Sequence, residues 1–544
     1  VSKEQTGYQN YCAWTLGESF NIDQLLDAHL ISLLLLSNSA SPLYKVLESN
    51  DLGKSPAQIL GLEDSMRHLV FICGIEGTEP KSQQKFNELV DKTFKNIVKD
   101  GFSEAQIDAA LYQLEMGKRE ISSGSLPYGL QILLSMAPGS LYKSDPLVLA
   151  SVDEALTRLK DRVKDKGYLN KLVDDLFVSN NHRVNLEMVP DLELINKKEA
   201  ELKKILDSIK SSMSSKEKLD LINDSKKLAD RQNAIPDKNV LPKLELTDVP
   251  KNTSYPKTKK LKTFGYSPTF YEQHTNGLTY NAVTKDLNIS SGEELGHLMA
   301  LTALFGKVGV EKRDYFQLQE EISRITGGIN TSNHFYYDEN NKIKGKISLS
   351  SKFLPENTVE ATELIFEILN ETKLDDEKRI KELMFQNFMG FQQSIVENGH
   401  RFAMLGASSS HSELSFVQEA IGGLSAINRF VPFISNQDDQ IKDQMQKMQK
   451  MLQKTKSDKN ELLFISNIKL TNEQIDGIRS LDFEKDGSSS INVEFSKTFN
   501  KVALPINTQV NFSAMSFDAP IYDPKDSPKF VLLSSLLRNE YLHK

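Results

Sequence analysis

Histidines and carboxylates are the side chains of this sequence that could bind a metal ion or move a proton. Zinc-binding helices carry two histidines four residues apart with a glutamate beside one of them, as in H-E-x-x-H and H-x-x-E-H. Neither pattern occurs among the nine histidines. The nearest segment is Gly292–His297, in which Glu293 and Glu294 precede one histidine and no second histidine is within reach. Because zinc needs at least three protein ligands, we predict no metal site there and expect His297 on a helix surface or half-buried.

The sequence also lacks the usual patterns for a nucleophile or a bound nucleotide. The run Gly406–Ser412 places three serines before His411, but it lacks the G-x-S-x-G spacing, and we interpret it as a Ser-rich loop. No glycine-rich phosphate-binding pattern is present. We therefore predict no catalytic, cofactor-binding or metal-binding residue in this chain. The other histidines, without a partner at ligand spacing, are His29 in an expected helix, His68 at the start of an expected strand, His182, His274, His334, His400 and His411 near expected turns or element ends, and His543 near the C-terminus.

Cys12 and Cys73 are the two cysteines of the chain. A secreted domain held together by disulfides would contain many more, so we expect no disulfide framework. Two thiols so far apart in sequence also cannot supply a cysteine-rich zinc site. We expect both to be small, half-buried residues.

The bulk composition bounds the size and class of the protein. At 544 residues the chain is too long for one hydrophobic core, and about three to four domains are expected. Its 66 basic and 74 acidic residues give a net charge of −8, which argues against general nucleic-acid binding. The most apolar run, Leu30–Leu36, is far shorter than the roughly 20 residues of a membrane span and predicts a buried helix. Since the chain starts at Val1 and stops at Lys544 inside a helical pattern, we expect both ends to be cut.

Residues 1–190 are expected to form one α/β unit. Leucines from Leu25 to Leu36 recur at helical spacing, and the apolar run Leu69–Ile75 predicts a strand. Ser103 with Gln106 three residues later is typical of a capping box at the start of a helix. Val184–Met188 alternates like a strand.

Residues 191–257 differ in composition from the unit before them. Asn196–Ala234 is rich in charged residues and serine and is interrupted at Ser211–Ser215, which predicts two antiparallel helices joined at those serines. A linker follows, because proline at this density resists regular structure. Its prolines are Pro236, Pro242, Pro250 and Pro256.

Residues 258–475 are expected to form a second α/β unit. Asn276-Gly277 before a strand-like run indicates a β-hairpin, and Asp375 is the expected N-cap of a helix. Methionines at helical spacing in Gln440–Thr455 are typical of a core or an interface. The other expected elements are helices at Gly292–Phe305 and Asp375–Glu397 and strands at Lys344–Leu349 and Leu462–Ile468.

Residues 476–544 are expected to begin a third unit. Val502–Met515 alternates like a long strand with Pro505 at an edge or bulge, and Asp523–Leu542 is mostly helical in pattern. The Leu-rich segments Leu30–Lys45 and Val531–Lys544 resemble each other, which indicates duplicated α/β units.

Several segments carry a resemblance to a known family. They are Ser41–Lys45 with Leu52-Gly53, the Pro-bounded Leu241–Pro250, Tyr271–Tyr280, the Thr-Gly-Gly turn within Arg324–Ile329, and Pro505 with residues 523–544. Their order and spacing around the charged hairpin resemble the presequence protease and falcilysin branch of the pitrilysin (insulinase) family of zinc metallopeptidases. The resemblance covers essentially the whole chain.

This resemblance implies repeated α/β domains, four in the family, arranged in two halves that a helical hairpin joins around a chamber for unfolded peptides. It assigns residues 1–190 to the second domain, 191–257 to the hairpin and Pro-rich linker, 258–475 to the third domain and 476–544 to the start of the fourth. The family's H-x-x-E-H motif and distal glutamate, which bind zinc and supply the general base, belong to the first domain and match no position here. The third domain is a degenerate copy of the first, which places Gly292–His297 where the motif would be.

We therefore expect a non-catalytic portion, chamber wall and hinge, of a zinc metalloendopeptidase that degrades short unstructured peptides such as cleaved presequences. The expected partners are such peptides and the missing catalytic domain, with zinc in the parent protein, none in this chain, and no nucleic acid or membrane. The alternative is a non-catalytic binding or assembly subunit of a pitrilysin-type complex. Relatives occur in mitochondria, other organelles and bacteria, so the compartment stays open.

Overall fold

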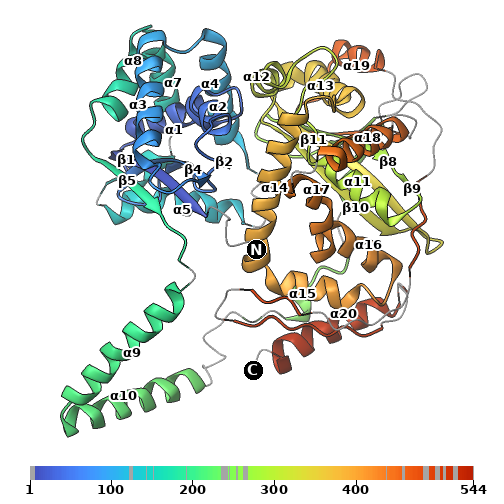
Figure 1. Cartoon of the computed structure of the whole chain (residues 1–544). Coiled ribbons are helices and arrows are strands. Elements are labelled where there is room, and N and C mark those ends of the chain that lie inside the picture. Colours follow the sequence, from blue (N-terminus) through green and yellow to red (C-terminus); the bar gives the residue numbers. More distant parts are fainter. Residues whose placement is uncertain are drawn as a thin grey trace.

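The computed structural model shows two units of mixed helix and strand side by side, and a pair of helices that projects away from them (Figure 1). We call residues 7–191 the first unit and residues 258–495 the second unit. The domain boundaries expected from the sequence stay a prediction. The structure describes residues 7–121, 126–142, 144–150, 152–191, 193–234, 243, 245–252, 255–260, 268–435, 438–455, 460–481, 489–495, 503–506, 510–518, 523 and 525–542.

The sheet of the first unit is antiparallel and is built around strand β1 (Tyr8–Glu18). β1 pairs with β4 (His68–Thr78) on one side and with β5 (Arg183–Met188) on the other, so the sheet joins the two ends of the unit. The short strands β2 (Ser55–Pro56) and β3 (Gly61–Glu63) pair with β4. The strands expected at 69–75 and 184–188 lie within β4 and β5 and are confirmed.

Helices cover one face of this sheet around Trp14, which is fully buried. The Trp14 ring meets Phe94 and Phe177 edge-on, with ring centres 5.5 Å apart in both pairs, and Phe94 stacks on Phe177 at 4.4 Å. Edge-on and stacked aromatic pairs add to the free energy gained by burial. The capping box of Ser103 and Gln106 is confirmed at the start of α4. The helices of the unit are α1 (Ile22–Leu36), α2 (Pro42–Glu48), α3 (Gln83–Asp100), α4 (Glu104–Arg119), α5 (Tyr128–Leu141), α6 (Pro146–Ala150), α7 (Val152–Val163), α8 (Tyr168–Val173) and a π-helical turn (Asp174–Val178).

The projecting pair consists of α9 (Leu194–Ser212) and α10 (Ser215–Asn233), which confirms two helices joined at the serines. Ser214 begins α10 through a capping box with Glu217. The helices diverge from their joint instead of packing along their lengths (Figure 1). No residue of either helix is buried, although each has an apolar stripe that includes Ile205 and Leu219.

The second unit contains a six-stranded sheet in the order β10-β11-β8-β12-β7-β6, in which β7 and β12 are parallel. The β-hairpin predicted at Asn276-Gly277 is wrong. Both residues do adopt positive φ angles, 52° and 81°, but their turn joins β7 to β8, and β12 lies between those two strands. The strands are β6 (Thr258–Lys260), β7 (Thr269–Glu272), β8 (Thr279–Asp286), β10 (Ile329–Tyr337), β11 (Ile343–Phe353) and β12 (Asn460–Ser466), with a separate small pair of β9 (Asn288–Ile289) and β13 (Ser490–Ile491).

The core of the second unit packs helices against this sheet. Met448 and Met451 are buried in it, which confirms a core role for the methionine stripe. The N-cap expected at Asp375 is wrong by one residue, because the Asp376 carboxylate accepts the backbone N–H of Arg379. The helices are α11 (Gly292–Thr302), α12 (Tyr315–Ile325), α13 (Thr358–Glu371), α14 (Glu377–Glu397), α15 (Gly399–Ser408), α16 (Glu413–Gly422), α17 (Val431–Ile434), α18 (Asp438–Thr455) and α19 (Asn472–Arg479), with 3-10 turns at Pro355–Asn357 and Leu424–Arg429.

The strand predicted at Val502–Met515 is wrong for the parts of that segment that the structure describes. Residues 503–506 and 510–518 contain no strand. Pro505 has no backbone N–H to give to a neighbouring strand. Phe512 instead lies over Gly399, where a Cβ would overlap its ring, and its ring centre is 6.4 Å from that of His400.

The helix expected near the C-terminal end is confirmed. It is α20 (Ser527–Leu536), which continues as a π-helical turn (Leu537–Leu542). Whereas α1 is largely buried, α20 has no buried residue, so the two similar Leu-rich segments lie in different surroundings. Among the described residues, no helix combines the length and the apolar character needed to cross a membrane.

We predict that Phe94→Ala lowers the free energy of unfolding of the first unit by about 3–5 kcal/mol, since it leaves a cavity between Trp14 and Phe177. Urea unfolding followed by tryptophan fluorescence measures this, because Trp14 is the only tryptophan. Leu246→Ala, at a position that is 92% exposed, is the control and should change stability by no more than about 0.5 kcal/mol. Equal midpoints for the two variants would contradict the packing described here.

Candidate functional site

The segment of acids and one histidine, which the resemblance places at the position of a metal motif, lies on α11. Ser291 caps this helix by accepting the backbone N–H of Glu294. The His297 ring is engaged on both sides: Nδ1 lies 2.9 Å from the Gln444 amide nitrogen, and Nε2 lies 3.3 Å from a Glu293 carboxylate oxygen. The side chain of His297 is 13% exposed, which confirms a half-buried residue on a helix.

Lysines of α18 neutralise both carboxylates of this segment. Lys447 Nζ lies 2.7 Å from Glu293, and Lys454 Nζ lies 2.8 Å from Glu294. Hydrogen bonds from Lys447 and then His297 lower the pKa of Glu293. Burial opposes ionisation of Glu294, but the bond with Lys454 outweighs it, and the pKa of that carboxyl is also lowered. Both carboxylates are therefore ionised at neutral pH and already bound to cations.

These side chains do not fit a zinc ion. Zinc requires several lone pairs that converge on one point, with an open position if it is to do chemistry. Here both nitrogens of His297 are in contact with other side chains, and each carboxylate faces an ammonium group. Within the described ranges, no group of three or more His, Cys, Asp or Glu residues could hold a metal. That the whole chain has no catalytic, cofactor-binding or metal-binding residue stays a prediction.

The two cysteines face each other across strands β1 and β4, and both are free thiols. Both are fully buried, so the expectation of half-buried residues is wrong. Cys12 Sγ also lies 3.2 Å from Arg183 Nη2. The hydrogen bond with Cys73 and the nearby guanidinium lower the pKa of Cys12, whereas burial raises the pKa of Cys73. The pair is sealed under α3 and gives no open position for a ligand.

The Ser-rich segment is the end of one helix and the start of the next, which confirms its interpretation as a turn. α15 ends at Ser408, and Ser412 caps α16 by accepting the backbone N–H of Ser415. His411 Nδ1 lies 2.9 Å from an Asp518 carboxylate oxygen. His334 differs from its expected position near a turn, because it lies in the middle of β10.

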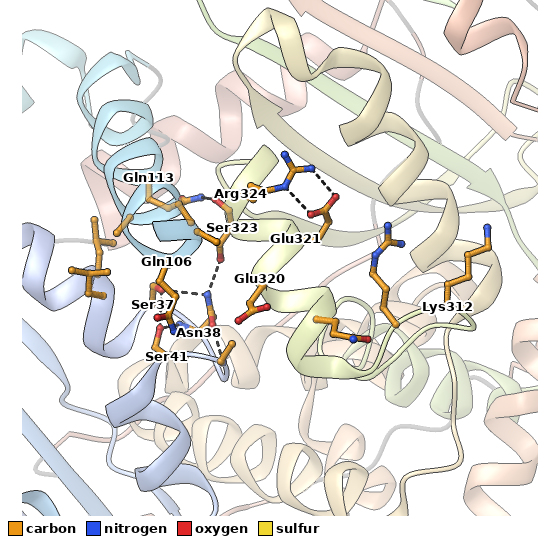
Figure 2. A pocket seen from close by; sticks show the side chains of 18 residues that line it. Ser37, Asn38, Ser41, Gln106, Gln113, Lys312, Glu320, Glu321, Ser323 and Arg324 are labelled. Atoms are coloured by element: carbon orange, nitrogen blue, oxygen red, sulfur yellow. Dashed lines mark hydrogen bonds and ion pairs between the residues drawn. The ribbon is translucent and has the colours of Figure 1, made fainter. Parts of the chain in front are cut away.

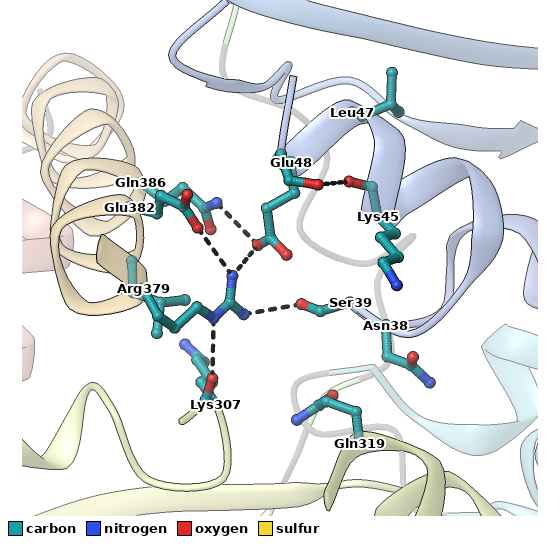
Figure 3. A network of polar contacts seen from close by, with 12 residues as sticks. Asn38, Ser39, Lys45, Leu47, Glu48, Lys307, Gln319, Arg379, Glu382 and Gln386 are labelled. Atoms are coloured by element: carbon teal, nitrogen blue, oxygen red, sulfur yellow. Dashed lines mark hydrogen bonds and ion pairs between the residues drawn. The ribbon is translucent and has the colours of Figure 1, made fainter. Parts of the chain in front are cut away.

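A buried ion pair connects the two units (Figure 3). Arg379 of α14 lies 2.8 Å from Glu48 at the end of α2, and each side chain is 4% exposed. The same guanidinium donates to the Ser39 hydroxyl at 2.9 Å, and Gln386 donates to the Glu48 carboxylate at 3.1 Å. The Arg379 guanidinium also lies 4.5 Å from the centre of the Tyr315 ring. Glu48 therefore has cationic and amide partners from the second unit only a few residues apart on one helix.

Polar side chains of α4 make a second set of contacts between the units. Gln113 Nε2 donates to the Ser323 carbonyl oxygen at 2.7 Å, and the Tyr112 hydroxyl donates to the Ile325 carbonyl oxygen at 3.1 Å. Glu120, just after α4, forms an ion pair of 2.8 Å with Lys352 of β11. Each of these bonds joins a side chain of the first unit to an element end of the second, so the interface fixes the orientation of both.

A cavity of about 400 Å³ lies within this interface (Figure 2). Helices α1 and α4 line one side with Leu33, Leu34 and small alanines, and α12 lines the other with charged residues. The amide of Asn38 crosses from the first side to the Ser323 hydroxyl at 2.7 Å. Glu321 and Arg324 on the α12 side bind each other. The cavity can admit a small molecule, but its walls already satisfy most of each other's charges.

Sequence patterns could not reveal this interface. Tyr112 and Gln113 stand on an ordinary amphipathic helix, and Arg379 stands in the first turn of another. Their partners are more than two hundred residues away in the chain, as the Tyr112–Ile325 and Gln113–Ser323 bonds show. The buried position of Arg379 is a signal that the fold alone supplies.

Comparisons with known proteins agree with this architecture. A family model described as the region associated with peptidases of family M16, subfamily C, matches residues 188–431. The chain is 27% identical to "Protein HypA" of Clostridium perfringens, over 83% of this chain and 47% of that protein. It is 27% identical to "Presequence protease 1, chloroplastic/mitochondrial" of Arabidopsis thaliana, over 76% and 39%. With "Presequence protease, mitochondrial" of Schizosaccharomyces pombe the identity is 24%, over 97% and 53%.

The matched region and the relatives define the class: the chain belongs to the pitrilysin family of peptidases. Within that family it is presequence protease-like. The chain spans about half the length of the curated relatives it matches.

We predict that Arg379→Met alone lowers the free energy of unfolding by about 3–5 kcal/mol, because it leaves the Glu48 carboxylate buried without its cation. Replacing both residues, Glu48→Met with Arg379→Met, should cost less than the single change. Chemical unfolding of both variants measures the difference as a double-mutant cycle.

The matched control is Arg324→Met, which removes an ion pair with Glu321 whose arginine side chain is 50% exposed. Its effect should be below about 1 kcal/mol. If Arg379→Met costs no more than this control, the ion pair does not hold the units together.

Proposed function

We propose that this chain is the non-catalytic portion of a zinc metalloendopeptidase that degrades short unstructured peptides such as cleaved presequences. Its two units would form part of the wall of a closed chamber, which selects peptides by shape and excludes folded proteins. Zinc and the general base would come from a domain of the parent protein that carries the H-x-x-E-H motif. The partners would be that domain and the peptides.

One observation carries the proposal beyond family likeness. On α11, Glu293, Glu294 and His297 occupy a helix start in the way that the family's motif would, but Lys447, Lys454 and Gln444 bind all three. A catalytic helix must keep its lone pairs available for a metal. The second unit therefore has the form of a catalytic domain whose site has been replaced by ion pairs, which supports a structural role.

The hairpin supports a hinge role in part. α9 and α10 connect the two units and touch neither of them with a buried residue, so they oppose no motion. The direct contacts between the units do oppose it, because Arg379 and Glu48 would have to separate. We propose that the two units move together and that the hairpin and linker accommodate the remaining change in chamber shape.

We predict that the purified chain contains no stoichiometric zinc and shows no chelator-sensitive cleavage of a fluorogenic unstructured peptide. Elemental analysis and a peptidase assay with and without a chelator measure both properties. One zinc per chain with chelator-sensitive cleavage would refute the proposal, and His297→Ala would then be the first variant to examine. Tight peptide binding in a natural parent without H-x-x-E-H would favour the alternative of a binding or assembly subunit.

We further predict that locking the hairpin slows peptide turnover in a parent protein that contains the zinc motif. Cysteines would be introduced at an exposed position of α9 and on the first unit and joined with a bifunctional maleimide; buried Cys12 and Cys73 should not react. The same variant without the cross-linker is the control. Turnover that is unchanged by the cross-link would rule out a hinge in the hairpin.

A further inference from the structure

Strand β10 is the edge of the six-stranded sheet: it pairs with β11 on one side and with no other strand of the described chain. Such an edge presents unpaired backbone N–H and C=O groups. Two cavities of about 490 and 470 Å³ open along it, and Asn333 lines both. We call these two cavities the β10 groove. Helices α14, α15 and α16 contribute the opposite wall.

The charges that line the β10 groove have one sign. Arg401 and Arg429 line it together with His334, and no aspartate or glutamate does. Neither guanidinium forms an ion pair with a carboxylate of the described residues, although the chain carries a net charge of −8. In an acidic protein whose arginines are mostly paired, two unpaired arginines in one groove indicate a site for an anion.

The surroundings of Arg429 show why an anion would be stabilising there. Its Nη1 donates to the Ile421 carbonyl oxygen at 2.8 Å, and its guanidinium lies 5.0 Å from the centre of the Phe430 ring. Burial lowers the pKa of Arg429 to about 10. A guanidinium has five N–H groups, and a single carbonyl oxygen satisfies one of them. A carboxylate in the groove would compensate the buried charge.

The groove also contains an acceptor that needs a donor. Asn333 Oδ1 is buried and has no hydrogen-bond partner within the described chain, while Nδ2 of the same side chain faces the Thr302 hydroxyl at 3.4 Å. A buried acceptor without a donor costs free energy. A backbone N–H of a bound peptide would supply that donor. Met299, Met384 and Phe391 give the groove an apolar floor.

We infer that the β10 groove binds an extended acidic peptide, which adds a strand to the edge of β10 and places its carboxylates against Arg401 and Arg429. The free strand edge matches the peptide backbone, Asn333 matches a peptide N–H, and the two arginines match acidic side chains or a C-terminal carboxylate. The inference rests on the proposed function for the source of the peptide, because a chamber wall meets unfolded chains.

The test is the affinity of the purified chain for a fluorescein-labelled peptide of nine residues, the length of β10, in which glutamate alternates with threonine. Fluorescence anisotropy measures Kd. We expect Arg429→Gln to weaken binding about tenfold or more, Arg401→Gln less, and added salt to weaken binding to the wild-type chain. Arg231→Gln, which removes the same charge from the exposed α10, is the matched control and should leave Kd unchanged.

Three further arms can overturn the inference. A peptide with glutamine in place of glutamate should bind about tenfold more weakly, and equal binding would exclude recognition of the carboxylates. A peptide methylated on alternate backbone nitrogens should also bind weakly, and full binding would exclude strand addition. Inorganic phosphate that displaces the peptide at micromolar concentration would indicate a site for a small anion and refute the proposal.

Folding is controlled separately. If Arg429→Gln unfolds, the exposed Arg401→Gln variant still decides the outcome, and circular dichroism verifies the structure of both. Binding is measured without turnover, whereas the proposed function fails on zinc content and cleavage. A chain that binds the peptide but contains zinc would therefore refute only the proposed function, and a chain without zinc that ignores the peptide would refute only this inference.

Discussion

The ion pair between Arg379 and Glu48 determines how the two units are arranged. Removing both charges from water costs several kcal/mol, and that cost is compensated only when the pair and its hydrogen bonds form together. Ser39, Gln386 and the Lys307 carbonyl complete the arrangement from both units. A shift of either unit by a few ångströms would leave a buried charge alone. The cavity beside α12 and the contacts of α4 follow from this fixed orientation.

The second unit shows how a fold can persist while its chemistry changes. α11 has the capped start, the early acids and the histidine that resemble a metal-binding helix. Lysines on α18 turn the same acids into partners of a helix–helix contact. The change requires no new secondary structure, only cations on a neighbouring helix. The family relation then concerns architecture, and the reaction of the parent protein is a separate question.

Local patterns predicted well, because their cause lies within a few residues. The capping box at Ser103 and the break of the hairpin at Ser211–Ser215 depend on nearby side chains and appear as expected. The β-hairpin at Asn276-Gly277 failed although its turn geometry is correct, because β12 enters from far along the chain. The strand expected at 502–515 failed because alternation alone does not supply a neighbouring strand.

The same distinction applies to the candidate sites. The resemblance located the α11 segment, since that segment is contiguous in sequence. It could not locate its lysine partners on α18, nor the edge position of β10 that exposes Asn333 between two cavities. Such features depend on which strand ends a sheet and which helix lies above it. They become visible only when the register of the sheet is known.

The exposed hairpin has a consequence for local stability. Helices of about this length are marginal in water without tertiary packing, and α9 and α10 have no buried residue. Their backbone amides should exchange hydrogen with solvent far faster than those of α1, whose leucines lie in the core of the first unit. The chain thus joins two slowly exchanging bodies through a segment that unfolds and refolds on its own while they remain intact.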